Sequence, residues 1–272
     1  MDVPGNYTPM ICKYRRPVIK KNRGEVEMTV RDSSQEKAAG GKSAEDLLLE
    51  NEWAKVEEFV RLLGRPDPLF PVEKDKTALM IMDMQVGFMA EDAPLGYPAA
   101  RSVVDNINRL SKACRGIGIP VIWVFWEVNT MDDWGLVTAF YPPAPDGSSA
   151  LSTIMADAAG ARIWPELVMD EDKDYQVGKC RYSAFIKGAS EAEKLLHSLA
   201  RDHIVMTGID SSVCVGASAM DAMALDFKVT VVSDATTTKN NIYHQVFLME
   251  LKKSFADVQT TEAILKMIKD LR

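Results

Sequence analysis

One cysteine stands where a predicted strand gives way to a predicted helix, and this position could make it a nucleophile. The segment TGIDSSVCVGASAMDAMALDF, residues 207–227, leads from an apolar strand through a polar turn to Cys214 and a helix of small residues. Unpaired backbone N–H groups and the helix dipole favour thiolate over thiol at such a position. We therefore expect the pKa of Cys214 to lie well below about 8.5. The alternative is a small buried cysteine that only helps the helix to pack.

Two charged residues follow other predicted strands. Asp83 ends the apolar run TALMIMD, where an ionised carboxylate is costly unless it is paired or used in chemistry. Lys179 lies in YQVGKCRYSAF, at the end of a shorter strand. The aspartate could accept the thiol proton, and the lysine could stabilise the thiolate and the charge that develops on a substrate carbonyl. Taken singly, each has an ordinary interpretation, a structural ion pair for Asp83 and a surface position for Lys179.

Other catalytic and binding motifs find little support. His203 begins a strand, at the wrong end for a site with Cys214. His197 lies inside a helix, and His244 is a remote candidate, so a Cys–His pair is poorly supported. No two histidines have the spacing of metal ligands and no CxxC occurs, so we expect neither a metal nor a cofactor. The stretch DMQVGFM after the first strand lacks a glycine-rich phosphate loop.

Strands and helices alternate along most of the chain, and they must position these residues. The predicted strands cover residues 77–83, 119–126, 175–179, 203–208, 228–233 and 256–259, and the predicted helices cover residues 98–116, 189–201, 214–226, 240–253 and 261–271. This alternation predicts an α/β fold, a three-layer α/β/α domain with a central, mostly parallel sheet of about six strands. Sites in such sheets lie beyond the carboxyl ends of the strands. Asp83, Trp126–Glu127 and the turn at 208–214 all lie there.

Residues 1–73 precede this pattern as an N-terminal extension, and residues 74–272 form the predicted catalytic domain. The extension includes a possible hairpin over residues 17–30 and an amphipathic helix that begins at Ser43. The apolar stripe of this helix must be covered, so we expect a homo-oligomer, dimer or larger, with the helix at an interface. In the alternative, the helix folds back on its own domain. The long segment 127–160 is predicted to form a lid over the site.

Composition excludes several classes of function. The chain of 272 residues has a net charge of −7 at pH 7, which argues against a general nucleic-acid binder. It contains no apolar run long enough to span a membrane. The amino terminus has no apolar segment typical of a secretory signal, and the four cysteines have irregular spacing. A reducing cytoplasm is therefore the expected location.

Three segments resemble the motifs of one family. ALMIMDMQVGF is similar to the first-strand motif of the isochorismatase-like cysteine hydrolases, KCRYSAF to their lysine motif, and TGIDSSVCVGASAMDAMALDFKVTVVSDAT to their nucleophile segment. The resemblance covers roughly residues 74–272 and implies a Rossmann-like hydrolase fold. It implies Asp83 as general acid/base, Lys179 as charge stabiliser and Cys214 as nucleophile. It also implies a cis peptide before Asp210, with the backbone N–H groups of Asp210 and Cys214 forming the oxyanion hole.

The resemblance also implies a class of reaction. The family includes nicotinamidases, isochorismatases, and ureidoacrylate, biuret and N-carbamoylsarcosine amidohydrolases. The stretch WEVNTMDDWG contains no histidine, which disfavours the metal site of nicotinamidases, and Cys214 favours amide chemistry. We expect a metal-independent cysteine hydrolase that cleaves a C–N bond of a small amide, ureide or carbamoyl substrate through a thioester. The alternatives are an isochorismatase-type enol-ether hydrolase and a non-catalytic scaffold that acts in binding or assembly.

Aromatic residues near the predicted strand ends are candidates for the wall of a substrate pocket. They are Phe88, Trp126, Trp134, Tyr182 and Phe185. Together they predict a narrow, largely apolar pocket, although any single one could equally fill the core.

Overall fold

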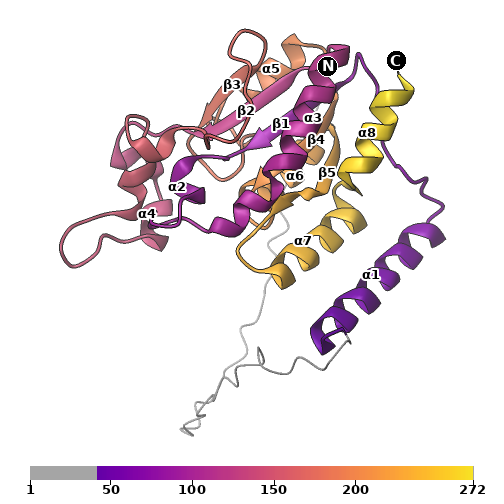
Figure 1. The fold of residues 1–272 in the computed structure, drawn as a ribbon, viewed down its shortest axis with the longest axis horizontal. Coiled ribbons are helices and arrows are strands. Elements are labelled where there is room, and N and C mark those ends of the chain that lie inside the picture. The colour runs from indigo at the N-terminus through magenta and orange to yellow at the C-terminus, as the bar shows by residue number, and fades with distance from the viewer. Residues whose placement is uncertain (1–41, 272) are drawn as a thin grey trace, which may run out of the picture. The chain divides into compact units, whose positions relative to one another are not determined.

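The central sheet has six strands, and every neighbouring pair is parallel. The computed structural model describes residues 42–271, of which those from Ala44 onward form one compact unit. The strands are β1 (Thr77–Met82), β2 (Val121–Trp126), β3 (Tyr175–Lys179), β4 (His203–Ile209), β5 (Lys228–Thr237) and β6 (Asp257–Gln259). Their order in the sheet is β3-β2-β1-β4-β5-β6 (Figure 1). The predicted fold class is confirmed. The predicted hairpin over residues 17–30 lies outside the described residues.

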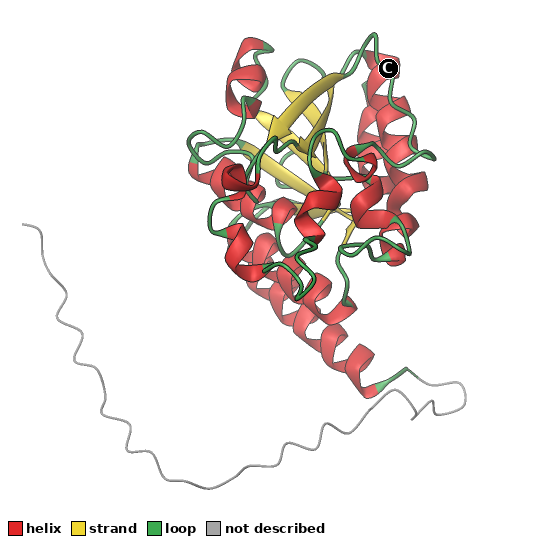
Figure 2. Ribbon diagram, turned by 90° about the vertical axis from the view of Figure 1, so that its left-hand side faces the viewer, coloured by secondary structure: helices red, strands yellow, loops and turns green. Residues whose placement is uncertain are grey.

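Helices cover both faces of this sheet (Figure 2). In β1, Ala78, Met80 and Met82 point to one face, and Leu79 and Ile81 point to the other. The first face packs against α5 (Ala192–Ser198), α6 (Cys214–Ala224) and α7 (Asn241–Ser254), and the second against α3 (Val104–Ile117) and α8 (Thr261–Asp270). Because β1 is buried on both faces, nearly all of its residues are apolar.

Short helical turns fill the connections on the side of the sheet where the strands end. They are α2 (Val86–Met89), η2 (Pro98–Val103), η3 (Met131–Trp134), α4 (Val137–Phe140), η4 (Ala150–Ile154) and η5 (Ala159–Ala161). Four of them lie in or next to the segment predicted as a lid. In residues 42–271, no helix is long and apolar enough to cross a membrane.

The strand order reverses direction between β1 and β4, and a glycine allows the two strands to meet closely there. The chain moves outward from β1 to β2 and β3, then returns to the other side of β1 with β4. Gly208 has a φ of +97°, and a Cβ atom at this position would lie 2.3 Å from the carbonyl oxygen of Met82. Only glycine tolerates both conditions. Parallel sheets bind ligands at such a reversal, so the fold predicts a site beyond β1 and β4.

The N-terminal helix α1 (Ala44–Leu62) packs against α7 of its own compact unit. The indole Nε1 of Trp53 donates a hydrogen bond of 2.8 Å to Oε1 of Gln245, and Leu49 and Val60 are buried. The helix therefore packs within the same compact unit as α7, and this unit begins at Ala44. Five apolar side chains of this segment remain exposed: Leu47, Leu48, Phe59, Leu62 and Leu63.

We expect these exposed side chains to place α1 at a contact between two copies of the chain. The full-length protein should then be at least a dimer by light scattering, because an apolar surface of this kind is costly to leave in water. The double substitution Leu48→Glu and Phe59→Glu should reduce the mass to that of the monomer. Val168→Glu, at an exposed apolar residue outside α1, is the matched control and should leave the mass unchanged. A monomeric wild-type chain would show that the expectation is wrong.

Candidate active site

Asp83, Lys179 and Cys214 come together beyond the carboxyl ends of the strands. The Nζ atom of Lys179 lies 3.0 Å from Oδ2 of Asp83 and 3.4 Å from Sγ of Cys214. All three residues are buried, with exposed fractions of 2% for Asp83, 1% for Lys179 and 5% for Cys214. The structure thus places an acid, a cation and a thiol in mutual contact, from three segments that are far apart in the sequence.

A tight turn after β1 positions the carboxylate of Asp83. Its φ is +53°, in the left-handed region that L-residues rarely adopt. The backbone N–H of Asp83 donates to the carbonyl of Val124 at 2.8 Å, and the N–H of Gln85 donates back to the carbonyl of Asp83 at 2.8 Å. A strained backbone conformation that neighbouring contacts hold in place is typical of functional sites.

Gln85 supports this turn, and the sequence analysis did not single it out. Its side chain is fully buried, and its Oε1 accepts a 2.8 Å hydrogen bond from the backbone N–H of Trp126. Its Nε2 donates to the carbonyls of Trp126 and Ala161. The side-chain amide of Gln85, just after β1, is thus hydrogen-bonded both to the end of β2 and to the end of the segment predicted as a lid. Its position could have been noticed in the sequence, because a polar residue two positions after Asp83 in an apolar stretch must find buried partners.

Lys179 ends β3 and sends its ammonium group inward. Besides Asp83 and Cys214, Nζ contacts the carbonyl of Arg181, to which it donates at 3.1 Å. It also lies 3.8 Å from the ring centroid of Trp126, a cation–π contact in a desolvated place. These partners replace the water that a buried ammonium group loses, so the charge is held at one position beside the thiol.

Cys214 is the first residue of α6, as predicted, and follows a turn whose backbone faces the pocket. The peptide bond between Ile209 and Asp210 is cis, as the resemblance implies. The backbone N–H groups of Val213 and Val215 both donate to the carbonyl of Asp210 at 3.0 Å, which closes the turn. Among the described residues, the N–H groups of Asp210 and Cys214 have no hydrogen-bond acceptor. These two donors are available to a bound molecule.

A buried histidine contacts the same turn through a hydrogen bond. His244 of α7 has Nε2 at 3.1 Å from the carbonyl of Ser233 and Nδ1 at 2.9 Å from the hydroxyl of Ser211. A carbonyl oxygen only accepts, so Nε2 carries the proton and Nδ1 accepts from Ser211. Burial lowers the pKa of His244, which agrees with a neutral ring. His244 thus contacts the turn and not Cys214. His203 is the first residue of β4, at the end of the strand away from Cys214, and its ring nitrogens contact the hydroxyls of Thr77 and Thr230.

Burial sets the protonation of the site. It raises the pKa of the Asp83 carboxyl, and the neighbouring ammonium group of Lys179 opposes the shift. Burial and, next, the Asp83 carboxylate raise the pKa of the Cys214 thiol. The prediction of a depressed thiol pKa is therefore wrong for the substrate-free site. The helix start and Lys179 do favour the thiolate, but desolvation and a second anion outweigh them.

We expect alkylation to report this difference. At neutral pH, iodoacetamide should modify the half-buried Cys180 before Cys214, because the Cys214 thiol is buried and protonated. The rate at Cys214 should rise steadily as the pH is raised to about 9. Peptide mass spectrometry over a time course measures both rates in one sample. Preferential modification of Cys214 at neutral pH would show that the pKa of this thiol is depressed, and it would contradict the raised pKa described above.

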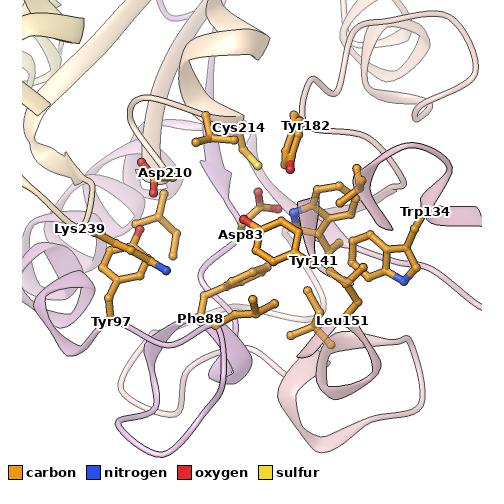
Figure 3. Close-up of a pocket in the computed structure, with 16 residues that line it drawn as sticks. Asp83, Phe88, Tyr97, Trp134, Tyr141, Leu151, Tyr182, Asp210, Cys214 and Lys239 are labelled. Atoms are coloured by element: carbon orange, nitrogen blue, oxygen red, sulfur yellow. The ribbon is translucent and has the colours of Figure 1, made fainter. Parts of the chain in front are cut away.

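Asp83 and Cys214 line a pocket of about 80 Å³ that is partly open to solvent (Figure 3). Four of the five predicted aromatic residues line it: Phe88, Trp126, Trp134 and Tyr182. Trp126 packs against Trp134 and Tyr182, with ring centroids 4.7 and 5.8 Å apart. The segment 127–160 contributes Trp134, Val137, Tyr141, Leu151 and Ile154, so it covers the site as predicted. Lining residues that the sequence analysis did not name include Leu95, Tyr97 and Lys239.

Phe185 does not line the pocket, which corrects the prediction for this residue. It is 5% exposed and packs against Phe227, with ring centroids 5.8 Å apart. The chain turns away after Tyr182 because the N–H of Ala184 donates to the hydroxyl of Ser218 on α6. This turn directs the phenyl ring into the core. In the described part of the chain, no group of three or more His, Cys, Asp or Glu side chains is arranged to hold a metal ion.

The sequence matches the isochorismatase domain family over residues 77–263. Ureidoacrylate amidohydrolase RutB of Caulobacter vibrioides is 31% identical, over 74% of this chain and 90% of the relative. A probable inactive nicotinamidase of Arabidopsis thaliana is 29% identical, over 65% of this chain and 88% of the relative. A cysteine hydrolase from Pseudomonas syringae has a similar fold, with a TM-score of 0.67 at 20% identity over 75% of this chain and 97% of that one. The chain belongs to the isochorismatase family of hydrolases.

Proposed function

We propose that this protein hydrolyses a C–N bond of a small amide, ureide or carbamoyl substrate, with Cys214 as its nucleophile and without a metal ion. One observation carries the proposal: Nζ of Lys179 lies 3.0 Å from a carboxylate oxygen and 3.4 Å from the thiol sulfur, at the base of a pocket. The group therefore includes a nucleophile, a proton acceptor and a fixed positive charge. The relative named as a ureidoacrylate amidohydrolase supports the same reaction class.

In the proposed mechanism, Asp83 takes the proton of the Cys214 thiol as the sulfur attacks the substrate carbonyl. The carbonyl oxygen becomes an oxyanion, which the N–H groups of Asp210 and Cys214 stabilise by hydrogen bonds. Asp83 then gives its proton to the leaving nitrogen, the C–N bond breaks, and the acyl group remains on sulfur as a thioester. Water attacks the thioester and gives its proton to Asp83. Transfer of this proton back to sulfur restores the thiol.

The raised pKa of Asp83 suits this sequence of steps. A carboxylate with an ordinary pKa is too weak a base to remove a thiol proton, and burial makes Asp83 a stronger one. Lys179 compensates for the negative charge whether it lies on Asp83 or on sulfur, because it contacts both. Asp83 must be ionised before each cycle, so kcat/KM is lost as the pH falls through its raised pKa.

The size and lining of the pocket limit the substrate. Its volume admits a molecule of few heavy atoms, and its walls are mostly aromatic and aliphatic. The relative described as a probable inactive nicotinamidase raises the alternative of a non-catalytic scaffold. A scaffold has no need for a buried acid, ammonium group and thiol in contact, since each is costly to desolvate. We therefore favour catalysis.

The direct test is hydrolysis of a panel of small amides, ureides and carbamoyl compounds by the full-length protein. Ammonia release measures turnover, and mass spectrometry of rapidly quenched samples detects an acyl group on Cys214. The proposal expects one chemical class to be hydrolysed with such an adduct. Hydrolysis of an enol ether, with all amides inert and no adduct, would replace it by the isochorismatase-type reaction.

A further inference from the structure

One residue after β3 contacts both Lys179 and the lid segment, residues 127–160, and it does not line the pocket. Arg181 lies two positions after Lys179 and is half-buried. Its Nη1 atom donates hydrogen bonds to the carbonyl of Cys180, at 2.6 Å, and to the carbonyl of Asp133 in η3. Its own backbone carbonyl accepts the hydrogen bond of 3.1 Å from Nζ of Lys179. Arg181 therefore joins the buried ammonium group to the lid from a position outside the pocket wall.

The lid segment has few polar attachments to the rest of the domain. Among the described residues, the backbone of residues 129–155 makes one hydrogen bond to a residue outside this range, the bond from Arg181. The hydroxyls of Tyr141 and Tyr182 form a second contact between the lid and the stretch after β3. Residues 139–148 are all exposed. A segment with few attachments and much exposed surface opens at a low cost in free energy, so its closed position depends strongly on the contact with Arg181.

The sequence around η3 leaves its backbone accessible to this guanidinium group. The N–H of Thr130 donates to Oδ2 of Asp133 at 2.9 Å, as part of a capping box, so the Asp133 carboxylate is engaged by the turn itself. The residue after the turn is Gly135, with a φ of +56°. A Cβ atom there would lie 3.2 Å from Nη2 of Arg181, so a side chain would crowd the guanidinium group. Glycine at this position thus allows Arg181 to reach the carbonyl of Asp133.

Two packed tryptophan rings complete a closed circuit of contacts. Trp134 directly follows Asp133, and its ring centroid lies 4.7 Å from that of Trp126. Nζ of Lys179 lies 3.8 Å from the ring centroid of Trp126. The circuit therefore runs from the guanidinium group of Arg181 through η3 and both indoles to Lys179, and it returns through the carbonyl of Arg181. If η3 moved outward, Trp126 would lose its packing partner, and the ammonium group would be held less firmly against this ring.

We propose that Arg181 is a positioning residue, which couples closure of the lid to the placement of the Lys179 ammonium group between Asp83 and Cys214. This inference rests on the proposed function and adds to it a residue that acts through Lys179. While the guanidinium group holds η3, the ammonium group stands 3.0 Å from the carboxylate and 3.4 Å from the thiol. Without this contact the lid opens more often, and the positive charge is less often at the position where it stabilises a developing anion.

The kinetic test is Arg181→Met, which keeps an unbranched side chain and removes its hydrogen-bond donors. With the best amide of the panel, kcat should fall by about tenfold or more, and this fall should exceed any rise in KM, because the interaction that is lost acts on developing charge. Arg181→Lys keeps a donor for the carbonyl of Asp133 and should recover part of the loss. Lys187→Met, at an exposed residue of the same segment, is the matched control and should keep kcat within about threefold. A rise in KM with kcat unchanged would overturn the proposal.

A double variant shows whether Arg181 acts through Lys179. In the Lys179→Met background, the addition of Arg181→Met should change kcat by less than about twofold, because no ammonium group remains to be placed. An equal loss of kcat in both backgrounds would show that Arg181 acts independently of Lys179, contrary to the proposal.

Hydrogen exchange separates this inference from the proposed function, because it requires no turnover. In the full-length protein without substrate, amide exchange measured by mass spectrometry should be faster over residues 130–141 in Arg181→Met than in wild type, and unchanged over β1. Coupling between two sites is reciprocal, so Lys179→Met should also speed exchange over residues 130–141 relative to β1. Both results would support the coupling even if no amide in the panel were hydrolysed. Unchanged exchange over residues 130–141 in either variant would refute it even if amides were hydrolysed.

Discussion

Replacing Cys214 by serine is expected to lower kcat by at least about 10³-fold, because loss of the nucleophile removes the covalent route altogether. Serine keeps nearly the same volume, and Sγ lies in a buried place, so the fold should survive the change. A hydroxyl is a far weaker acid than a thiol, and Asp83 is not a strong enough base to ionise it. Ammonia release from the best amide of the panel measures the loss, and the melting temperature checks the fold.

Cys180→Ser is the matched control for this substitution. Cys180 directly follows Lys179, but its Sγ lies 3.7 Å from the carbonyl of Gly188 and has no contact with Asp83 or Cys214. The control should therefore keep wild-type kcat within about threefold, in the range of an ordinary surface change. If Cys214→Ser retained most of its activity while the control did too, the thioester route would be excluded. A reaction that needs no nucleophile, such as enol-ether hydrolysis, would then be the better account.

The second large effect concerns the buried pair of Asp83 and Lys179. Lys179→Met should lower the free energy of unfolding by about 3–5 kcal/mol, because it leaves a carboxylate buried without its cation. It should also lower kcat by about 10²–10³-fold, the usual effect of removing a group that stabilises developing charge. Asp83→Asn should cause losses of both kinds, since it strands the ammonium group and removes the base. Chemical denaturation and steady-state kinetics measure the two quantities.

The double variant, Asp83→Asn with Lys179→Met, separates stability from catalysis. With both charges removed, no buried charge lacks a partner, so much of the lost stability should return. Activity should stay at the level of the worse single variant, because neither the base nor the cation is restored. Losses of stability that simply add would show that the two side chains do not interact. Recovery of activity in the double variant would remove both residues from the mechanism.

The outline of the fold and the three contacting residues were accessible from the sequence. A continuous apolar run such as TALMIMD indicates a strand that is buried on both faces. The alternation of such strands with helices is compatible with only a few sheet topologies. All strands of a parallel sheet end at the same edge, so residues at or just after strand ends, such as Asp83 and Lys179, could be expected to meet. The start of α6 at Cys214 followed from its local pattern in the same way.

The pocket beyond these residues could be predicted only in part. Phe185 and Tyr182 are three residues apart, yet one fills the core and the other lines the pocket, because a hydrogen bond to Ser218 turns the chain between them. Lys239 and Tyr97 come from distant segments that meet only through the packing of η2 beside β5. The hydrogen-bond partners of Gln85 and His244 lie in distant segments, so the sequence does not show which groups these side chains contact.

The protonation of the site shows most clearly where the sequence stops being informative. The sequence by itself determined that Cys214 begins a helix, which favours the thiolate. Only the tertiary structure decided that the thiol is 5% exposed and lies beside the Asp83 carboxylate, and both features raise its pKa. Helix position depends on a few neighbouring residues, whereas desolvation and charge depend on everything within several ångströms, which the fold brings together from β1, β3 and α6.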